Sequence, residues 1–127
     1  MTAPESGDDL DGLLVRLRQL SLIRLDAVIA GVSGEDRAEI TEALASDLED
    51  ALGQAHERAA ALLATLGRGP GPLAIAQTAA RRSADPETRL RWRSQLQARA
   101  RVARDLHRLW SAAEAVLPVL ADADRAR

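Results

Sequence analysis

The stretch ITEALASDLEDALGQAHERAAALLATL, residues 40–66, decides the fold of this 127-residue chain. Its apolar side chains recur at a mean step of about 3.7 residues, which is the spacing of one face of a straight α-helix. That stripe consists of Ile40, Leu44, Leu48, Ala51, Ala55, Ala59, Leu62 and Leu66. Gly53 interrupts the stretch, and the pattern leaves open whether the helix continues through this glycine or turns there.

Three further helices are predicted around this stretch, over residues 10–30, 73–82 and 86–117. The first carries aliphatic side chains around more than half of a helical wheel, so we expect it to touch neighbours on two sides. No segment shows the alternation of apolar and polar residues that is typical of a strand. The chain is therefore predicted to be all-α, a small bundle of four or five helices with a long C-terminal helix.

Capping residues and prolines predict where the helices begin and end. Ser33 and Asp85 are candidate N-caps, and Pro86 strengthens the second start signal because proline suits the first helical position. Pro118 is predicted to stop the last helix because it lacks a backbone N–H. The predicted organisation is a disordered leader over residues 1–9, a single domain over residues 10–117 and a flexible tail over residues 118–127.

The composition is that of a soluble globular protein, with 46% hydrophobic and 28% charged residues. The absence of cysteine excludes disulfides and cysteine-ligated metals. All 17 basic residues are arginine, which indicates the codon bias of a high-GC bacterium. The longest uncharged run, residues 69–80, is well short of the roughly 20 residues of a membrane helix, and the acidic N-terminus has no signal-peptide pattern. We therefore expect a cytoplasmic protein without membrane contact.

Charge is distributed unevenly along a chain whose net charge is −2. Residues 33–66 carry a net charge of −6, and residues 67–117 carry +6. Acids lie opposite the apolar stripe of the first segment, at Glu35, Glu39, Glu42, Glu49, Asp50 and Glu57. An arginine stripe of roughly 22 Å follows one outward face of the last helix, at Arg93, Gln97, Arg101, Arg104 and Arg108. Because both faces point away from the bundle, we expect no pairing between them within one molecule.

The arginine stripe has three interpretations. It could bind nucleic acid, although the acidic chain as a whole argues against that partner. It could instead meet an acidic face of a partner protein or of a second copy, since arginine suits bidentate contacts with carboxylates. The third interpretation is a face that is merely solvated.

Trp92 and Trp110 are the only aromatic side chains, and they lie eighteen residues, or five helical turns, apart. As the largest packing units available, they are expected in the core, on the face opposite the arginine stripe. If the short N-terminal helices leave them uncovered, they become anchors for a partner. Arg99 lies near the centre of the same apolar face. We expect it to reach solvent, to pair with an acid such as Asp26 or Asp47, or to mark where a partner helix docks.

The chain shows no motif of an enzyme that uses a metal or a bound nucleotide. Neither His56 nor His107 follows a glutamate by three residues, so the spacing of di-iron bundles is missing, and there is no phosphate-binding glycine loop. Arg101 and His107 match the loose spacing of helical HEPN-type ribonucleases, a match that chance supplies in a chain with 17 arginines. His56 lacks the Lys-Gly that follows a phosphotransfer histidine. We predict no catalytic residue, no metal site and no cofactor.

The order of several segments resembles the HAAS domain, a small all-helical module associated with helix-turn-helix regulators. Residues 25–40 read LDAVIAGVSGEDRAEI, residues 44–50 read LASDLED, and residues 59–67 read AAALLATLG, with Pro70 and Leu73-Ala74 after them. Together they match the module's pattern of a leucine-bearing helix, a small turn, an acidic helix start and an alanine-rich helix ending in Leu-Gly. The resemblance covers about half of the chain, from residue 17 to residue 80.

The chain departs from that pattern at several positions. Gly69 adds a glycine before Pro70, Asp47 stands where relatives often have histidine, and a long arginine-rich helix replaces the membrane helices that commonly follow. The resemblance implies a helix break at Gly53 and a signalling role in which the module pairs with a PadR-like DNA-binding regulator. It supplies no catalytic residues.

We therefore expect a non-enzymatic interaction and signalling module in transcription regulation, with a PadR-like regulator or a second copy as its partner. The alternative is a helical nucleic-acid-binding regulator that uses the arginine face of residues 93–108, and a helical HEPN-type ribonuclease ranks third. The candidate partner-binding residues are Trp92, Arg93, Arg99, Arg101, Arg104, Arg108 and Trp110.

Overall fold

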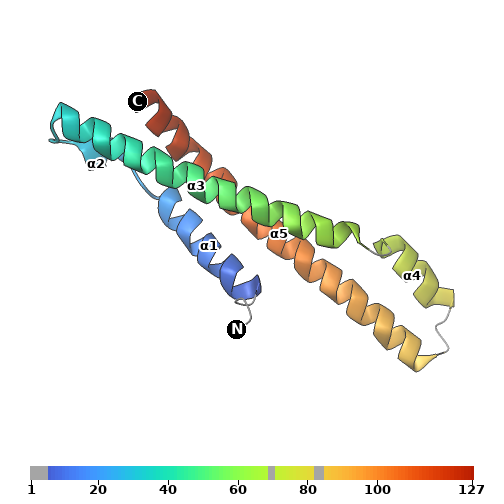
Figure 1. Ribbon diagram of the computed structural model, residues 1–127. Coiled ribbons are helices and arrows are strands. Elements are labelled where there is room, and N and C mark those ends of the chain that lie inside the picture. The colour runs from blue at the N-terminus through green and yellow to red at the C-terminus, as the bar shows by residue number, and fades with distance from the viewer. Residues whose placement is uncertain (1–5, 69–70, 82–84) are drawn as a thin grey trace, which may run out of the picture. The chain divides into compact units, whose positions relative to one another are not determined.

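A computed structural model describes residues 6–68, 71–81 and 85–127, and these residues form helices without any strand. The helices are α1 (Ser6–Ser21), α2 (Leu25–Ile29), α3 (Gly34–Gly67), α4 (Pro72–Arg81) and α5 (Pro86–Ala126) (Figure 1). This confirms the prediction of an all-α bundle with a long C-terminal helix.

The chain forms two compact units, and its two longest helices contribute to both. Unit 1 comprises Met1–Arg58 and Arg108–Arg127, and unit 2 comprises Ala59–His107. Unit 1 therefore contains α1, α2, the first part of α3 and the last part of α5. Unit 2 contains the end of α3, all of α4 and the first part of α5. The residues predicted as one domain, 10–117, are distributed over both units.

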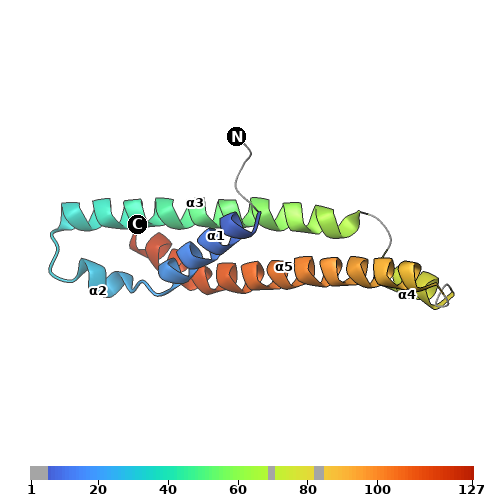
Figure 2. The same cartoon turned by 90° about the horizontal axis from the view of Figure 1, so that it is seen from below.

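The core of unit 1 joins α1 to α3 and α5. Its largest fully buried side chains are Leu17, Leu48, Leu109 and Val116. Small residues fill the rest of the seam, because Ala45, Ala51, Ala55 and Ala123 are also buried. Two ion pairs at the edge of this core join α1 to its neighbours. Arg16 pairs with Asp50 of α3, and Asp11 pairs with Arg108 of α5. In Figure 2, α1 lies across this part of α3 and α5.

Unit 2 has a much smaller core. Ile75 of α4 is 1% exposed and is the only fully buried large side chain among the described residues of this unit. Trp92 and Leu96 of α5 and Leu62 and Leu66 of α3 are half-buried. The apolar stripe predicted from residues 40–66 is therefore the inward face of α3. It is buried at Leu48, Ala51 and Ala55 in unit 1 and half-buried at its other positions.

The predicted helix over residues 10–30 is wrong, because two helices occupy this range. The Ser21 hydroxyl donates to the Arg18 carbonyl oxygen at 2.7 Å, and such a local bond competes with continuation of a helix. The backbone then tightens, with Leu22 N–H donating to the Gln19 carbonyl oxygen, and α2 begins at Leu25, a buried residue. Gly31 ends this region with φ of +79°, a conformation that favours glycine.

The predicted disordered leader is also wrong over residues 6–9, which belong to α1. The remainder of that leader, residues 1–5, lies outside the described residues. So do residues 69–70, in the predicted break after Gly67, and residues 82–84, ahead of the predicted Asp85 start signal.

Gly53 lies inside a continuous α3, so the helix break that the HAAS resemblance implies at this position is wrong. A glycine in a helix interior costs about 1 kcal/mol relative to alanine. The neighbouring residues Leu48, Ala51 and Ala55 are buried in unit 1, and packing of this face outweighs the local cost.

Pro118 does not end the last helix, because α5 continues through it to Ala126. Proline removes one backbone hydrogen bond, but Val119 and Ala123 beyond it are buried in the core of unit 1. The prediction of a flexible tail over residues 118–127 is wrong for the same reason, and Arg127 makes ion pairs with α3.

The predicted start of α5 at Asp85 and Pro86 is confirmed. The Asp85 carboxylate accepts a hydrogen bond from the Glu87 backbone N–H at 3.2 Å and another from the Thr88 hydroxyl. The bond from Thr88 is the main reason that the pKa of Asp85 lies below its ordinary value. At the start of α3, the Ser33 hydroxyl donates instead to the Asp36 carboxylate at 3.0 Å.

Candidate interaction surface

The two tryptophans have different environments. Trp92 is half-buried in unit 2, and its buried indole Nε1 has no hydrogen-bond partner. Trp110 is 61% exposed in unit 1, and its Nε1 donates to Glu114 Oε1 at 2.7 Å. The prediction of a core position is therefore wrong for Trp110.

The reason that Trp110 is exposed lies in the register of α5 within unit 1. The residues buried there are Leu109, Val116 and Ala123, which are seven residues apart, together with Val119. Trp110 follows Leu109 and projects about 100° away from this seam around the helix. Leu117, seven residues further on, is 51% exposed and lies on the same side as Trp110.

The arginines of the predicted stripe also divide between the units. Arg93, Arg101 and Arg104 are exposed in unit 2, and their side chains make no hydrogen bond or ion pair within the described parts of the chain. Arg108 belongs to unit 1, where its Nη2 lies 3.8 Å from Asp11 Oδ1.

Arg99 serves as a cap for the C-terminus of α3 inside unit 2. Its Nη2 donates to the Leu66 carbonyl oxygen at 2.6 Å, and its Nη1 donates to the Arg68 carbonyl oxygen at 3.2 Å. The last carbonyl groups of a helix lack partners within it and carry partial negative charge, so a guanidinium group is well suited to this position. The expectation that Arg99 pairs with Asp26 or Asp47 is wrong. Arg99 is half-buried, and its guanidinium group binds the end of α3 instead.

Two exposed residues beside Arg93 in unit 2 were not among the residues predicted from the sequence. Arg89 and Leu90 are exposed, and with Pro86 and Arg93 they line an open depression of about 350 Å³. Leu90 is 64% exposed, so unit 2 combines an apolar patch with arginines at this point. The available signal was the spacing, because Arg89 precedes Arg93 by four residues and extends the arginine stripe by one turn.

Some acids of α3 form ion pairs with arginines that lie outside the predicted stripe. Asp50 pairs with Arg16 at 3.2 Å. Arg127 lies 2.9 Å from Glu42 and 3.2 Å from Glu49, and it also pairs with Asp124 at 3.0 Å.

These bonds change the ionisation of both partners. The hydrogen bond from Arg127 holds the pKa of Glu42 below its ordinary value, and the bond to Glu42 is the main cause that raises the pKa of Arg127. Glu35, Glu39, Asp47 and Glu57 are the exposed acids of α3 whose carboxylates keep no hydrogen bond or ion pair within the described residues.

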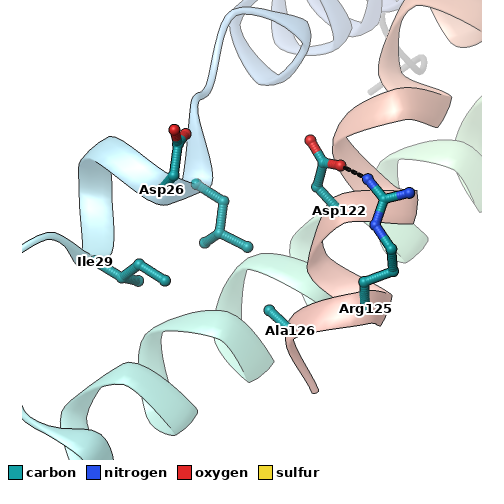
Figure 3. Close-up of a pocket in the computed structure, with 6 residues that line it drawn as sticks. Asp26, Ile29, Asp122, Arg125 and Ala126 are labelled. Atoms are coloured by element: carbon teal, nitrogen blue, oxygen red, sulfur yellow. Dashed lines mark hydrogen bonds and ion pairs between the residues drawn. The ribbon is translucent and has the colours of Figure 1, made fainter.

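A depression of about 490 Å³ lies in unit 1, between α2 and the end of α5 (Figure 3). Leu25, Ile29 and Ala126 supply its apolar wall, and Asp26, Asp122 and Arg125 supply its polar groups. Asp122 and Arg125 pair with each other, as the dashed line in Figure 3 marks. The depression is open to solvent, and Asp26 projects from α2 apart from this pair.

Both histidines are exposed, and no hydrogen bond or ion pair joins either of them to another described residue. Over residues 6–68, 71–81 and 85–127, no group of three or more His, Cys, Asp or Glu side chains is arranged to hold a metal ion. No helix in the same ranges has the length and apolar character needed to cross a membrane. Comparisons with protein-family models, with curated proteins and with solved structures found no match.

Proposed function

We propose that this protein is a non-enzymatic helical interaction module that binds a protein partner, either a PadR-like transcription regulator or a second copy of itself. The observation that carries the proposal is Trp110, which is 61% exposed although Leu109 beside it is buried. An exposed tryptophan is costly to hydrate and is enriched among the residues that dominate protein–protein binding. Leu117 extends the same apolar surface by two turns.

Tryptophan fluorescence tests this proposal directly, because the chain has only two tryptophans. The variant Trp92→Phe leaves Trp110 as the reporter, and Trp110→Phe leaves Trp92 as the matched control. We expect the emission of the first variant to shift to shorter wavelength as its concentration rises or as a PadR-like regulator is added. The emission of the control should change little.

Truncation of the anchor should weaken the same contact. Removal of a central interface tryptophan typically costs at least about 2 kcal/mol, or roughly 30-fold in Kd, so Trp110→Ala should lower affinity by this order. If neither concentration nor the regulator changes the emission of the Trp92→Phe variant, this surface has no such partner and the proposal fails.

A helical nucleic-acid-binding regulator is the second candidate, and the exposed Arg93, Arg101 and Arg104 favour it. Binding to an oligonucleotide at several salt concentrations separates the two. Each phosphate contact contributes a slope of about −0.9 in log K against log salt on duplex DNA, so three contacts predict a slope of about −3. A slope near zero removes nucleic acid as the partner of these arginines.

No geometric observation favours the HEPN-type ribonuclease. Arg101 and His107 are both exposed, and within the described residues neither has a hydrogen-bond partner. If the chain cleaves RNA and Arg101→Ala or His107→Ala abolishes that cleavage, the non-enzymatic proposal is overturned.

A further inference from the structure

The division of the chain into two units is also a division of charge. Unit 2, residues 59–107, contains nine arginines and three acids, which give a net charge of +6. Unit 1 contains the remaining eight arginines and sixteen acids, which give a net charge of −8. Each molecule therefore contains two units whose net charges are opposite in sign and similar in magnitude.

The positive charge of unit 2 is concentrated on one helix. Arg89, Arg93, Arg101 and Arg104 project from the first part of α5, and all four are exposed. They span about 22 Å at 1.5 Å per residue. None of the four side chains has an ion pair or hydrogen bond within the described residues. We call this set the basic face.

The negative charge of unit 1 includes acids that its own arginines leave unpaired. Arg16 and Arg127 pair with Asp50, Glu42 and Glu49, as described above. Glu35, Glu39 and Glu57 are exposed and have no such bond within the described parts of the chain. Because these three positions are four and eighteen residues apart, they lie on one side of α3, over about 33 Å. We call this set the acidic face.

We infer that the partner of each basic face is the acidic face of a second copy of this chain. This inference rests on the proposed function and narrows it to self-association. The basic face is short enough to fit within the acidic face, and arginine binds carboxylates with two parallel hydrogen bonds. The two contacts in such a dimer are equivalent: unit 2 of each copy binds unit 1 of the other, and a two-fold axis relates them.

The charge of unit 1 favours a second copy over nucleic acid. The acids of unit 1, whose net charge is −8, repel a phosphate backbone. A second copy instead supplies its acidic unit 1 as the binding partner, and every copy contributes one such unit for each basic face. Exposed Leu90 lies beside Arg89 and Arg93, so the contact also buries apolar surface.

A charge-swap experiment tests the inference with two full-length variants. The first variant carries Arg93→Glu, Arg101→Glu and Arg104→Glu, which replaces three of the four arginines of the basic face by acids and lowers the net charge of unit 2 from +6 to zero. The second carries Glu35→Arg, Glu39→Arg and Glu57→Arg, so that both of its faces are basic. All six side chains are exposed, and circular dichroism should show unchanged helicity for both variants.

We expect the wild type to be dimeric at low salt and each variant alone to be monomeric when measured by light scattering. An equimolar mixture of the two variants should restore the dimer, because each face then meets a face of opposite charge on the other chain. Pairing of the faces inside one molecule predicts no rescue, since mixing would change nothing.

Several results would overturn the inference. These are a monomeric wild type, variants that dimerise as the wild type does, or a mixture that stays monomeric. Salt-dependent binding of an oligonucleotide by the wild type that the first variant alone loses would assign the basic face to nucleic acid. A monomeric wild type whose Trp110 emission still responds to the regulator would refute self-association and leave the proposed function standing.

Discussion

Arg99 and Arg101 lie two residues apart in α5 and have different roles. Helical periodicity correctly predicts that Arg99 lies on the apolar side and Arg101 on the outward side. It could not predict that Arg99 binds the carbonyl oxygens of Leu66 and Arg68, because these acceptors are more than thirty residues away in the sequence. They exist only once the end of α3 is placed beside α5 in unit 2.

We predict that Arg99→Ala lowers the free energy of unfolding by about 1–2 kcal/mol, because two charge-assisted hydrogen bonds to the end of α3 are lost. Denaturant unfolding measures this change. Arg101→Ala is the matched control and should alter stability by less than about 0.5 kcal/mol, since its side chain is exposed. Equal changes in the free energy of unfolding for the two substitutions would contradict the capping role of Arg99.

Arg127 makes a second contact of this kind, between α5 and α3 in unit 1. We predict that Arg127→Ala lowers stability at neutral pH and that the difference from wild type shrinks in acid. Because the folded pKa of Glu42 is lowered from 4.5, its contribution is fully present above that value and is lost as the pH falls through the folded pKa.

Thermal unfolding at a series of pH values measures the effect of Arg127. Arg125→Ala is the control, because Arg125 pairs with Asp122 of its own helix and leaves Glu42 untouched. A difference between Arg127→Ala and wild type that is the same at pH 7 and at pH 3 would show that the Glu42 pair does not contribute.

At the level of elements, helix type and the inward face of α3 follow from the sequence, whereas several helix ends do not. The stripe through Leu48 and Ala55 has one period and predicts one buried face. Gly53 and Pro118 are strong local signals for helix ends, yet α3 and α5 pass through them because burial of Ala55 and of Val119 stabilises the longer helices. Tertiary packing of this kind cannot be seen in a local pattern.

We predict that Gly53→Ala raises the free energy of unfolding by about 0.5–1 kcal/mol. The position is helical, and an added Cβ would have no atom within 4 Å, so only the backbone entropy of the unfolded chain changes. Gly31→Ala should be destabilising, because Gly31 has a φ of +79°. Loss of stability in Gly53→Ala would mean that α3 bends or turns at this glycine.

At the level of the whole molecule, the core is concentrated in unit 1. Eleven of the twelve buried hydrophobic residues described belong to this unit, and Ile75 alone belongs to unit 2. We predict that backbone amides of α4 exchange with deuterium much faster than those around Leu48 and Val116, because few apolar contacts oppose their opening. Equal protection in both units would contradict this prediction.

The candidate surface was only partly predictable at this scale. The segregation of charge along the sequence anticipated a basic and an acidic region, and Arg93, Arg101 and Arg104 are exposed as expected. The exposure of Trp110 was only the alternative to the predicted core position, because it depends on which neighbours cover α5 in unit 1. Those neighbours, α1 and α3, are joined to α5 only by long-range contacts.

The molar mass of the full chain in solution, at low and at raised salt, tests self-association through the basic and acidic faces. Self-association predicts a dimer, twice the chain mass of 13.6 kDa, that dissociates as salt screens the opposite charges of the two units. A mass of 13.6 kDa at every protein and salt concentration would contradict it.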